Sequence, residues 1–137
     1  MAIAIDTSVL VDVLLPDPRF VKESETALKK SSRSGLIICE AVIAELVPVA
    51  KSSAAMEAFL AEWEITFVAS SLSSATIAGE MYRQYLQRGG KRGRVVPDFL
   101  IGAHAQNHAD ALLARDYGFF RDYFKGLTVI DPSPPSL

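Results

Sequence analysis

Residues 3–12, IAIDTSVLVD, join two different patterns at a single carboxylate. The apolar run that ends at Ile5 is typical of a short buried strand, and the apolar residues from Val9 onward recur at the spacing of an amphipathic helix. Asp6 stands between the two, where a charge is costly unless hydrogen bonds or a cation compensate it. The stretch therefore predicts a strand, a turn that holds a charged group, and a helix.

The same alternation of strand and helix continues along the chain. Short apolar runs predict strands at residues 2–5, 36–39, 65–69, 111–114 and 127–131. Helical spacing and capping residues predict helices at 7–15, from Pro18 to Gly35, at 40–50 with an interruption or a kink near Pro48, at 52–63, from a Ser73 or Ser74 cap to Gly89, and from an Asp98 N-cap to Ala109. Strands that alternate with helices form parallel sheets through right-handed crossovers. The predicted fold class is therefore α/β, a three-layer α/β/α sandwich around a central, mostly parallel five-stranded sheet.

The length and composition indicate one domain. The 137 residues are half apolar and 22% charged, which is typical of a chain that folds around its own core. We expect a single domain over residues 1–132 and a loose, Pro-rich tail over residues 133–137. Cys39 is the only cysteine and lies in an apolar run, so we expect a buried small hydrophobe. The N-terminus lacks a basic, signal-like segment, which favours the cytoplasm.

The charge balance limits how the protein can bind nucleic acid. The net charge is −2 and the isoelectric point is near 5.6, whereas proteins that rely on neutralising phosphates alone are usually basic. A nucleic-acid substrate would need cations or a local basic patch. The loop that contains Lys91, Arg92 and Arg94 could supply such a patch, and it is equally well explained as a solvated connection.

Several acidic residues fall at the predicted strand ends, where parallel α/β sheets bind their ligands. Asp6 ends the first strand, Asp98 begins the helix before the fourth strand, and Asp116 lies just beyond that strand. Taken singly, the first two are explained as helix N-caps and the third as a loop residue. Glu45 lies on an apolar helical stripe, and Glu40 points about 140° away from it, so Glu45 is favoured for a shared site.

Carboxylates gathered at one edge of a sheet would repel one another. Two unit charges about 4 Å apart cost roughly 4 kcal/mol at an effective dielectric of 20, and a divalent cation removes that cost. Hard oxygen ligands without a cysteine cluster favour Mg²⁺ or Mn²⁺. His104 and His108 have the i, i+4 spacing of metal ligands, but their segment lacks a third ligand, so we expect them on the helix surface or facing a partner.

Five segments of the chain occur in a characteristic order and spacing: IDTSVLVDVLL (5–15), ICEAVIAEL (38–46), PDFLIGAHA (97–105), ALLARDYGFF (111–120) and GLTVIDP (126–132). In these segments the chain resembles a PIN domain, the small nuclease domain of VapC-type toxins in bacterial and archaeal toxin–antitoxin pairs. The resemblance implies that the acidic site consists of Asp6, Glu45, Asp98 and Asp116, with the Ser8 hydroxyl supporting the first. Ala114 departs from the family pattern, which commonly has Thr or Ser two residues before the last acid, and Asp122 is a possible substitute for that acid.

The resemblance implies an endoribonuclease that uses one or two Mg²⁺ or Mn²⁺ ions and leaves a 5′-phosphate and a 3′-hydroxyl. It further implies a small antitoxin partner, which lays a helix and an arginine-bearing tail across the acidic centre, and a homodimer. Tyr82 and Tyr85 could stack on RNA bases, but their spacing is explained more simply by helix packing.

The residues leave two alternatives to the endoribonuclease function. One is a non-catalytic PIN-like interaction module, and the other is a metal-dependent phosphatase of small phosphoesters. The chain lacks a second Asp two residues after Asp6, which argues against the commonest phosphatase of this kind.

Overall fold

The computed structural model describes residues 2–92 and 95–133. Its centre is a single sheet of five strands in the order β3-β2-β1-β4-β5, and every neighbouring pair is parallel. Arg94 and most of the predicted tail, residues 134–137, lie outside the described residues. The strands are β1 (Ile3–Ile5), β2 (Leu36–Ile38), β3 (Ile65–Phe67), β4 (Ala111–Leu113) and β5 (Val129–Ile130).

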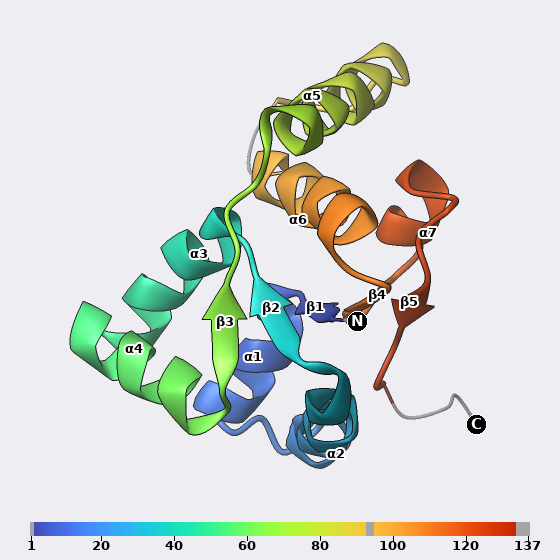
Figure 1. The fold of residues 1–137 in the computed structure, drawn as a ribbon. Coiled ribbons are helices and arrows are strands. Elements are labelled where there is room, and N and C mark those ends of the chain that lie inside the picture. Colours follow the sequence, from blue (N-terminus) through green and yellow to red (C-terminus); the bar gives the residue numbers. More distant parts are fainter. Residues whose placement is uncertain (1, 93–94, 134–137) are drawn as a thin grey trace.

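Helices cover both faces of this sheet, which confirms the predicted three-layer α/β architecture (Figure 1). The helices α1 and α6 lie on opposite faces of the sheet. On the side of α1, α2 and α3 pack beside it and α4 packs on α3, whereas α5 packs along α6. The helices are α1 (Thr7–Leu14), α2 (Val21–Ser31), the 3-10 turn η1 (Ser32–Ser34), α3 (Glu40–Ala50), α4 (Ser53–Glu62), α5 (Leu72–Gln87), α6 (Val96–His108) and α7 (Phe119–Tyr123).

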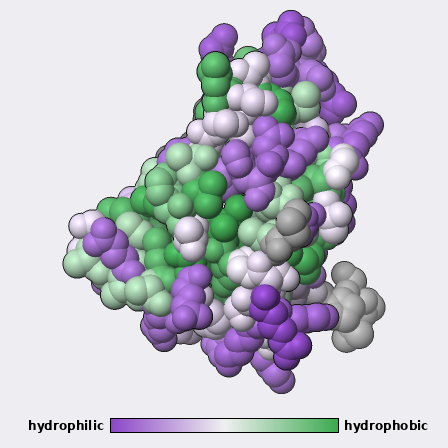
Figure 2. Space-filling model, in the orientation of Figure 1, coloured by the Kyte–Doolittle hydropathy of each residue, from purple (hydrophilic) through white to green (hydrophobic). Residues whose placement is uncertain are grey.

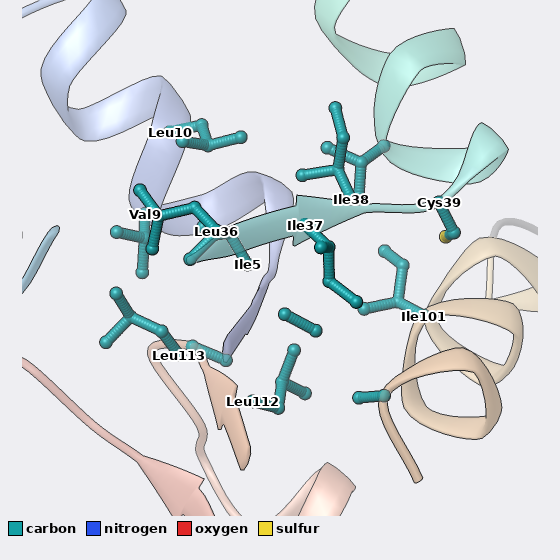
Figure 3. Packing of buried hydrophobic residues seen from close by; sticks show 14 of the residues in the cluster. Ile5, Val9, Leu10, Leu36, Ile37, Ile38, Cys39, Ile101, Leu112 and Leu113 are labelled. Carbon is teal, nitrogen blue, oxygen red and sulfur yellow. The ribbon is translucent and has the colours of Figure 1, made fainter. Parts of the chain in front are cut away.

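The core explains why the central strands are apolar on both faces. All residues of β1, β2 and β4 are buried. Successive side chains of a strand point to opposite faces, so Ile38 lies on the side of the sheet that carries Leu10 of α1, whereas Ile37 points toward Ile101 of α6 (Figure 3). The short apolar runs of β1, β2 and β4 are therefore strands covered by helices on both sides.

Several predicted helix boundaries were wrong. The helix α3 is not interrupted at Pro48, because the proline lies in its last turn, where its missing N–H removes one hydrogen bond. The cap of α5 is Ser71, whose side chain accepts the amide of Ser74, and not Ser73 or Ser74. The short helix α7 was not predicted.

The start of α6 also differs from the prediction. The helix begins at Val96, with Pro97 in its first turn, so Asp98 lies inside the helix and not at its N-cap. Proline suits this position because its fixed φ matches the helix and no hydrogen bond is lost there. The Asp98 carboxylate is therefore not used as a cap.

Two further observations concern predicted properties of the chain. Cys39 is buried as expected, and burial raises the pKa of its thiol. Within the described residues, no helix is both long and apolar enough to cross a membrane.

Candidate functional site

Asp6 directly follows β1 and caps α1. Its Oδ2 atom accepts hydrogen bonds from the Ser8 amide at 3.1 Å and from the Ser8 hydroxyl at 2.5 Å, so the N-cap prediction is confirmed. The residue is only 7% exposed. Burial raises the pKa of Asp6, the Ser8 hydrogen bonds oppose that shift, and the charge of Glu45 adds to it. Asp6 is therefore a buried acid that feels a second acid nearby.

Glu45 reaches the same region from α3. The Thr7 hydroxyl, one residue after Asp6, donates a hydrogen bond of 2.6 Å to Glu45 Oε1. Glu40, in the first turn of the same helix, instead accepts hydrogen bonds from the amide and hydroxyl of Ser70. The two glutamates thus face different segments, as the helical geometry predicts.

Asp98 completes a cluster of three acids. Burial, followed by the charges of Asp6 and Glu45, raises its pKa from 3.8 to about 7. All three carboxylates are therefore electrostatically coupled to one another. Asp6 comes from the N-cap of α1, Glu45 from α3 and Asp98 from α6, and we call these three acids the acidic cluster.

No ion pair compensates the acidic cluster within residues 2–92 and 95–133. The ion pairs in this part of the protein use other acids, namely Asp12, Asp17, Glu25, Glu80, Asp116 and Asp122. The negative charge of Glu45 raises the pKa values of Asp6 and Asp98, and the charge of Asp6 adds to the shift of Asp98. This arrangement favours the binding of a proton or a cation.

Asp116 is buried, but its carboxylate already has partners. Its two oxygens accept the amides of Gly118, Phe120 and Arg121 at 3.0 to 3.2 Å, which fixes the start of α7. The alternative acid, Asp122, is half exposed and forms an ion pair of 2.9 Å with Arg88. The charges that raise the pKa of Asp98 are those of the acidic cluster and not of these two residues.

Sequence reasoning missed a second buried acid, Asp12, which is 2% exposed. Both of its oxygens bind Arg115 at 2.9 Å, and its Oδ2 also accepts the Ser24 hydroxyl at 2.7 Å. The Arg115 side chain lies over the ring of Phe20, 4.1 Å from its centroid. The sequence did contain a sign of this buried acid, namely the single charge within the apolar run VLVDVLL, because a buried charge needs a partner.

The Asp12–Arg115 pair is connected to the acidic cluster through Ser8. The Arg115 amide donates to the Ser8 hydroxyl at 3.3 Å, and that hydroxyl in turn donates to Asp6. The loop after β4 is thus tied to the first acid of the cluster.

The prediction for His104 was wrong. The residue is 1% exposed, and its Nε2 atom lies 2.7 Å from the Val68 carbonyl oxygen. Burial lowers the pKa of His104. The helix α6 is covered by the sheet, α3 and α5, so few of its faces reach the surface. His108 lies at the end of this helix, where it contacts the Ser74 hydroxyl at 3.1 Å.

Of the predicted RNA-contacting residues, Lys91 and Arg92 are exposed. Arg94 lies outside the described residues. Tyr82 and Tyr85 pack against Phe99, as expected from their helical spacing.

The acidic cluster fits a hard divalent cation in its chemistry, because all of its donors are carboxylate oxygens and their mutual repulsion favours a positive charge. Within the described residues, no group of three or more His, Cys, Asp or Glu side chains is arranged so that it could hold a metal ion. Magnesium is commonly bound by one or two carboxylates and keeps several waters. The donor set therefore fits such an ion, whereas direct coordination by all three carboxylates does not.

The protein is therefore a small α/β domain with a parallel sheet and a cluster of three acids. The family model of the PIN domain matches residues 3–125, so the chain belongs to the PIN domain family. PIN domains are generally nucleases that use divalent metal ions. None of the curated proteins compared with the chain matches it.

Solved structures with this fold include three toxin–antitoxin complexes. The VapBC2 complex of Rickettsia felis, bound to a promoter DNA fragment, has a TM-score of 0.72 at 20% identity and covers 96% of this chain and 98% of that chain. A toxin–antitoxin complex from Klebsiella pneumoniae has a TM-score of 0.70 at 20% identity, and the match covers 98% of this chain and 100% of that chain. VapBC-1 from nontypeable Haemophilus influenzae has a TM-score of 0.70 at 15% identity, and the match covers 96% of this chain and 98% of that chain. At these identities, the likeness shows a shared fold.

Proposed function

We propose that the protein is a Mg²⁺- or Mn²⁺-dependent endoribonuclease and the toxin of a VapBC-type toxin–antitoxin pair. The observation that carries this proposal is the acidic cluster, in which Asp98 is coupled to Asp6 and Glu45 without an ion-pair partner among the described residues. Family membership supports nuclease chemistry at the same site.

In this proposal, the three carboxylates of the acidic cluster hold the ion directly or through water. A bound divalent ion lowers the pKa of a water molecule and neutralises charge on the phosphate. Ser8 fixes the Asp6 carboxylate, and Thr7 fixes Glu45, so both acids are oriented before the ion binds. Asp116 holds the loop beside the cluster and contributes through water, because its oxygens already accept three amides.

The reaction is the hydrolysis of an RNA phosphodiester. The oxygen of water forms a bond to phosphorus, and the bond from phosphorus to the 3′ oxygen breaks. The leaving oxygen takes a proton, which gives a 3′-hydroxyl and a 5′-phosphate. The exposed side chains of Lys91 and Arg92, seven and six residues before Asp98, contact the phosphate backbone, together with Arg94.

We propose an antitoxin as the protein partner and a homodimer as the assembly. The likeness to solved toxin–antitoxin complexes supports an antitoxin. Apolar side chains gather on the face formed by α3, α4 and β3, which includes the half-exposed Phe67 (Figure 2). Apolar patches of this kind are typical of protein interfaces.

The proposal is tested by incubating the purified protein with total RNA, with and without Mn²⁺, and mapping the ends of the products. We expect cleavage only with the ion, with 5′-phosphate ends. Cleavage that survives a chelator, or that the Asp98→Asn variant retains in full, would contradict the metal mechanism. The sequences at the mapped ends also identify the class of RNA that is cut.

A second candidate is a non-catalytic interaction module. The observation that favours it is the lack, within the described residues, of a ready-made group of three metal ligands. Calorimetry separates the two candidates, because the nuclease binds Mn²⁺ and the interaction module does not. Turnover of a chromogenic phosphate monoester without RNA cleavage would instead support a phosphatase.

A further inference from the structure

Tyr117 is an aromatic residue exposed to solvent in the loop after β4, two residues after Arg115. Its side chain is 86% exposed, the same fraction as Leu72 and well above that of any other large apolar residue in the described chain. An aromatic ring in this state gains almost nothing from burial in the folded protein. The contribution of this ring to stability therefore does not explain its position.

The backbone on both sides of Tyr117 is fixed. Arg115 is anchored by two hydrogen bonds to Asp12, and Asp116 is anchored by three amides of the following turn. The Tyr117 hydroxyl accepts a hydrogen bond of 3.4 Å from Arg115 Nη1. The ring is therefore an exposed group on a rigid support, which lowers the entropic cost of contacting a ligand.

The position of Tyr117 relative to the acidic cluster follows from the hydrogen bonds of Ser8. This hydroxyl contacts the Arg115 amide at 3.3 Å and Asp6 Oδ2 at 2.5 Å. Hydrogen bonds of 2.5 and 3.3 Å, followed by two residues of chain that span at most about 7 Å, place the Tyr117 backbone within about 13 Å of Asp6 Oδ2. The ring is within reach of bases that flank a phosphate bound at the cluster.

The surroundings of Tyr117 match a polyanion that carries flat rings. Arg115 contacts its hydroxyl, and the side chain of Arg121, 58% exposed, lies beside Asp116. Exposed aromatic rings with nearby cations are how proteins bind single-stranded nucleic acid, because every base can stack and every phosphate is negative.

We propose that Tyr117 is a substrate-binding residue that stacks on an unpaired base of RNA next to the cleaved phosphodiester. The inference rests on the proposed ribonuclease function and adds a contact that selects single-stranded substrate. Stacking depends on the ring and not on the hydroxyl. Tyr117→Phe should therefore retain the contact, and Tyr117→Ala should lose it.

The test measures the fluorescence anisotropy of a labelled single-stranded oligoribonucleotide in the Asp98→Asn background, so that binding is observed without cleavage. We expect Tyr117→Ala to weaken binding about 5- to 100-fold. Tyr117→Phe should stay within about twofold of its parent by the same reasoning. Leu72→Ala is the matched control, because it removes an equally exposed side chain on α5 and should change nothing.

A second readout uses a tryptophan as a reporter. RNA should quench the fluorescence of the Tyr117→Trp variant and leave the parent, whose only tryptophan is Trp63, unchanged. In the active protein, Tyr117→Ala should raise KM with little change in kcat.

The outcomes separate this inference from the proposed function. If the parent binds and cleaves RNA but Tyr117→Ala binds it equally well, the stacking contact is wrong and the ribonuclease stands. If the parent neither binds nor cleaves RNA under any metal condition, both are wrong. If Tyr117→Ala weakens the binding of a protein partner but not of RNA, the residue belongs to a protein interface, and the inference is overturned.

Discussion

Two acids of this protein, Asp12 and Asp98, have opposite electrostatic surroundings. Asp12 is almost completely buried and receives two hydrogen bonds from Arg115 and one from Ser24. Asp98 is partly buried, and the charges that act on its pKa are negative. Burial alone therefore does not identify a functional acid. Asp12 has a cationic partner and holds the fold together, whereas Asp98 has none among residues 2–92 and 95–133 and can accept a ligand.

The first prediction removes the cation that pairs with Asp12. Arg115→Met leaves a buried carboxylate without its cation, so we expect the free energy of unfolding to fall by about 3–5 kcal/mol. Urea denaturation at neutral pH measures this loss. The control is Arg19→Ala, which breaks the exposed pair with Asp17 and should cost less than about 1 kcal/mol. Equal losses in the two variants would contradict the structural role of the buried pair.

The second prediction removes a charge from the uncompensated cluster. Asp98→Asn should reduce RNA cleavage by more than about 100-fold, because it removes a donor to the metal ion, while the circular dichroism spectrum stays unchanged. Asp122→Asn is the matched control, since Asp122 is exposed and paired with Arg88. Its cleavage rate should stay near that of the parent. A strong loss in the control would move the fourth acid of the site to Asp122.

The third prediction concerns Ser8, which connects the two regions. Ser8→Ala removes the hydroxyl that donates to Asp6 and accepts from the Arg115 amide. We expect a loss of cleavage of about 10-fold, as is typical when a residue behind a metal ligand is removed. Ser8→Thr keeps the hydroxyl and should restore most of the rate. If alanine and threonine behave alike, the hydroxyl does not orient Asp6.

The smallest expected effect is the pH dependence of stability without metal. The pKa of Asp98 is about 7 in the folded protein and 3.8 ordinarily, so the folded state binds this proton more tightly. The stabilisation by this proton is complete below pH 3.8 and is lost as the pH rises through 7. After allowance for solvent screening, we expect a loss of about 1 kcal/mol, or roughly 3 °C in Tm.

Thermal unfolding between pH 5 and 8 in a chelator measures this slope. The Asp98→Asn variant should show a smaller slope, because it has no proton to lose at this position. At pH 7.5, Mn²⁺ at ten times its Kd should raise the stability of the parent by about 1.4 kcal/mol. The same ion should have a much smaller effect on the variant. A parent that is indifferent to both pH and Mn²⁺ would contradict the coupling of the three acids.

The fold could be predicted from the sequence because its signals are local. Each strand of the sheet core is a short apolar run, and each major helix has its own apolar spacing. The helix α7 lacked such a signal, since five residues are too few to show a period. Its start is instead fixed by Asp116, which appears in the sequence as an ordinary loop residue.

The site was predictable only in part. The rule that ligands bind beyond the strands selected Asp6, and the apolar stripe of α3 selected Glu45, and both belong to the acidic cluster. The pair of Asp12 and Arg115 joins residues 103 positions apart, so no local pattern could reveal it. The burial of His104 likewise depends on elements that pack around α6 from distant parts of the chain.

The position of β1 between β2 and β4 has a consequence for synthesis on the ribosome. The N-terminal strand emerges first, yet the Asp6 amide bonds to the Leu113 carbonyl, more than a hundred residues later. At about 5–20 residues per second, the nascent chain waits roughly 5–20 s for that partner. The pairing of β1 with β4, which ties Asp6 to the segment after β4, can therefore form only after residue 113 has been synthesised.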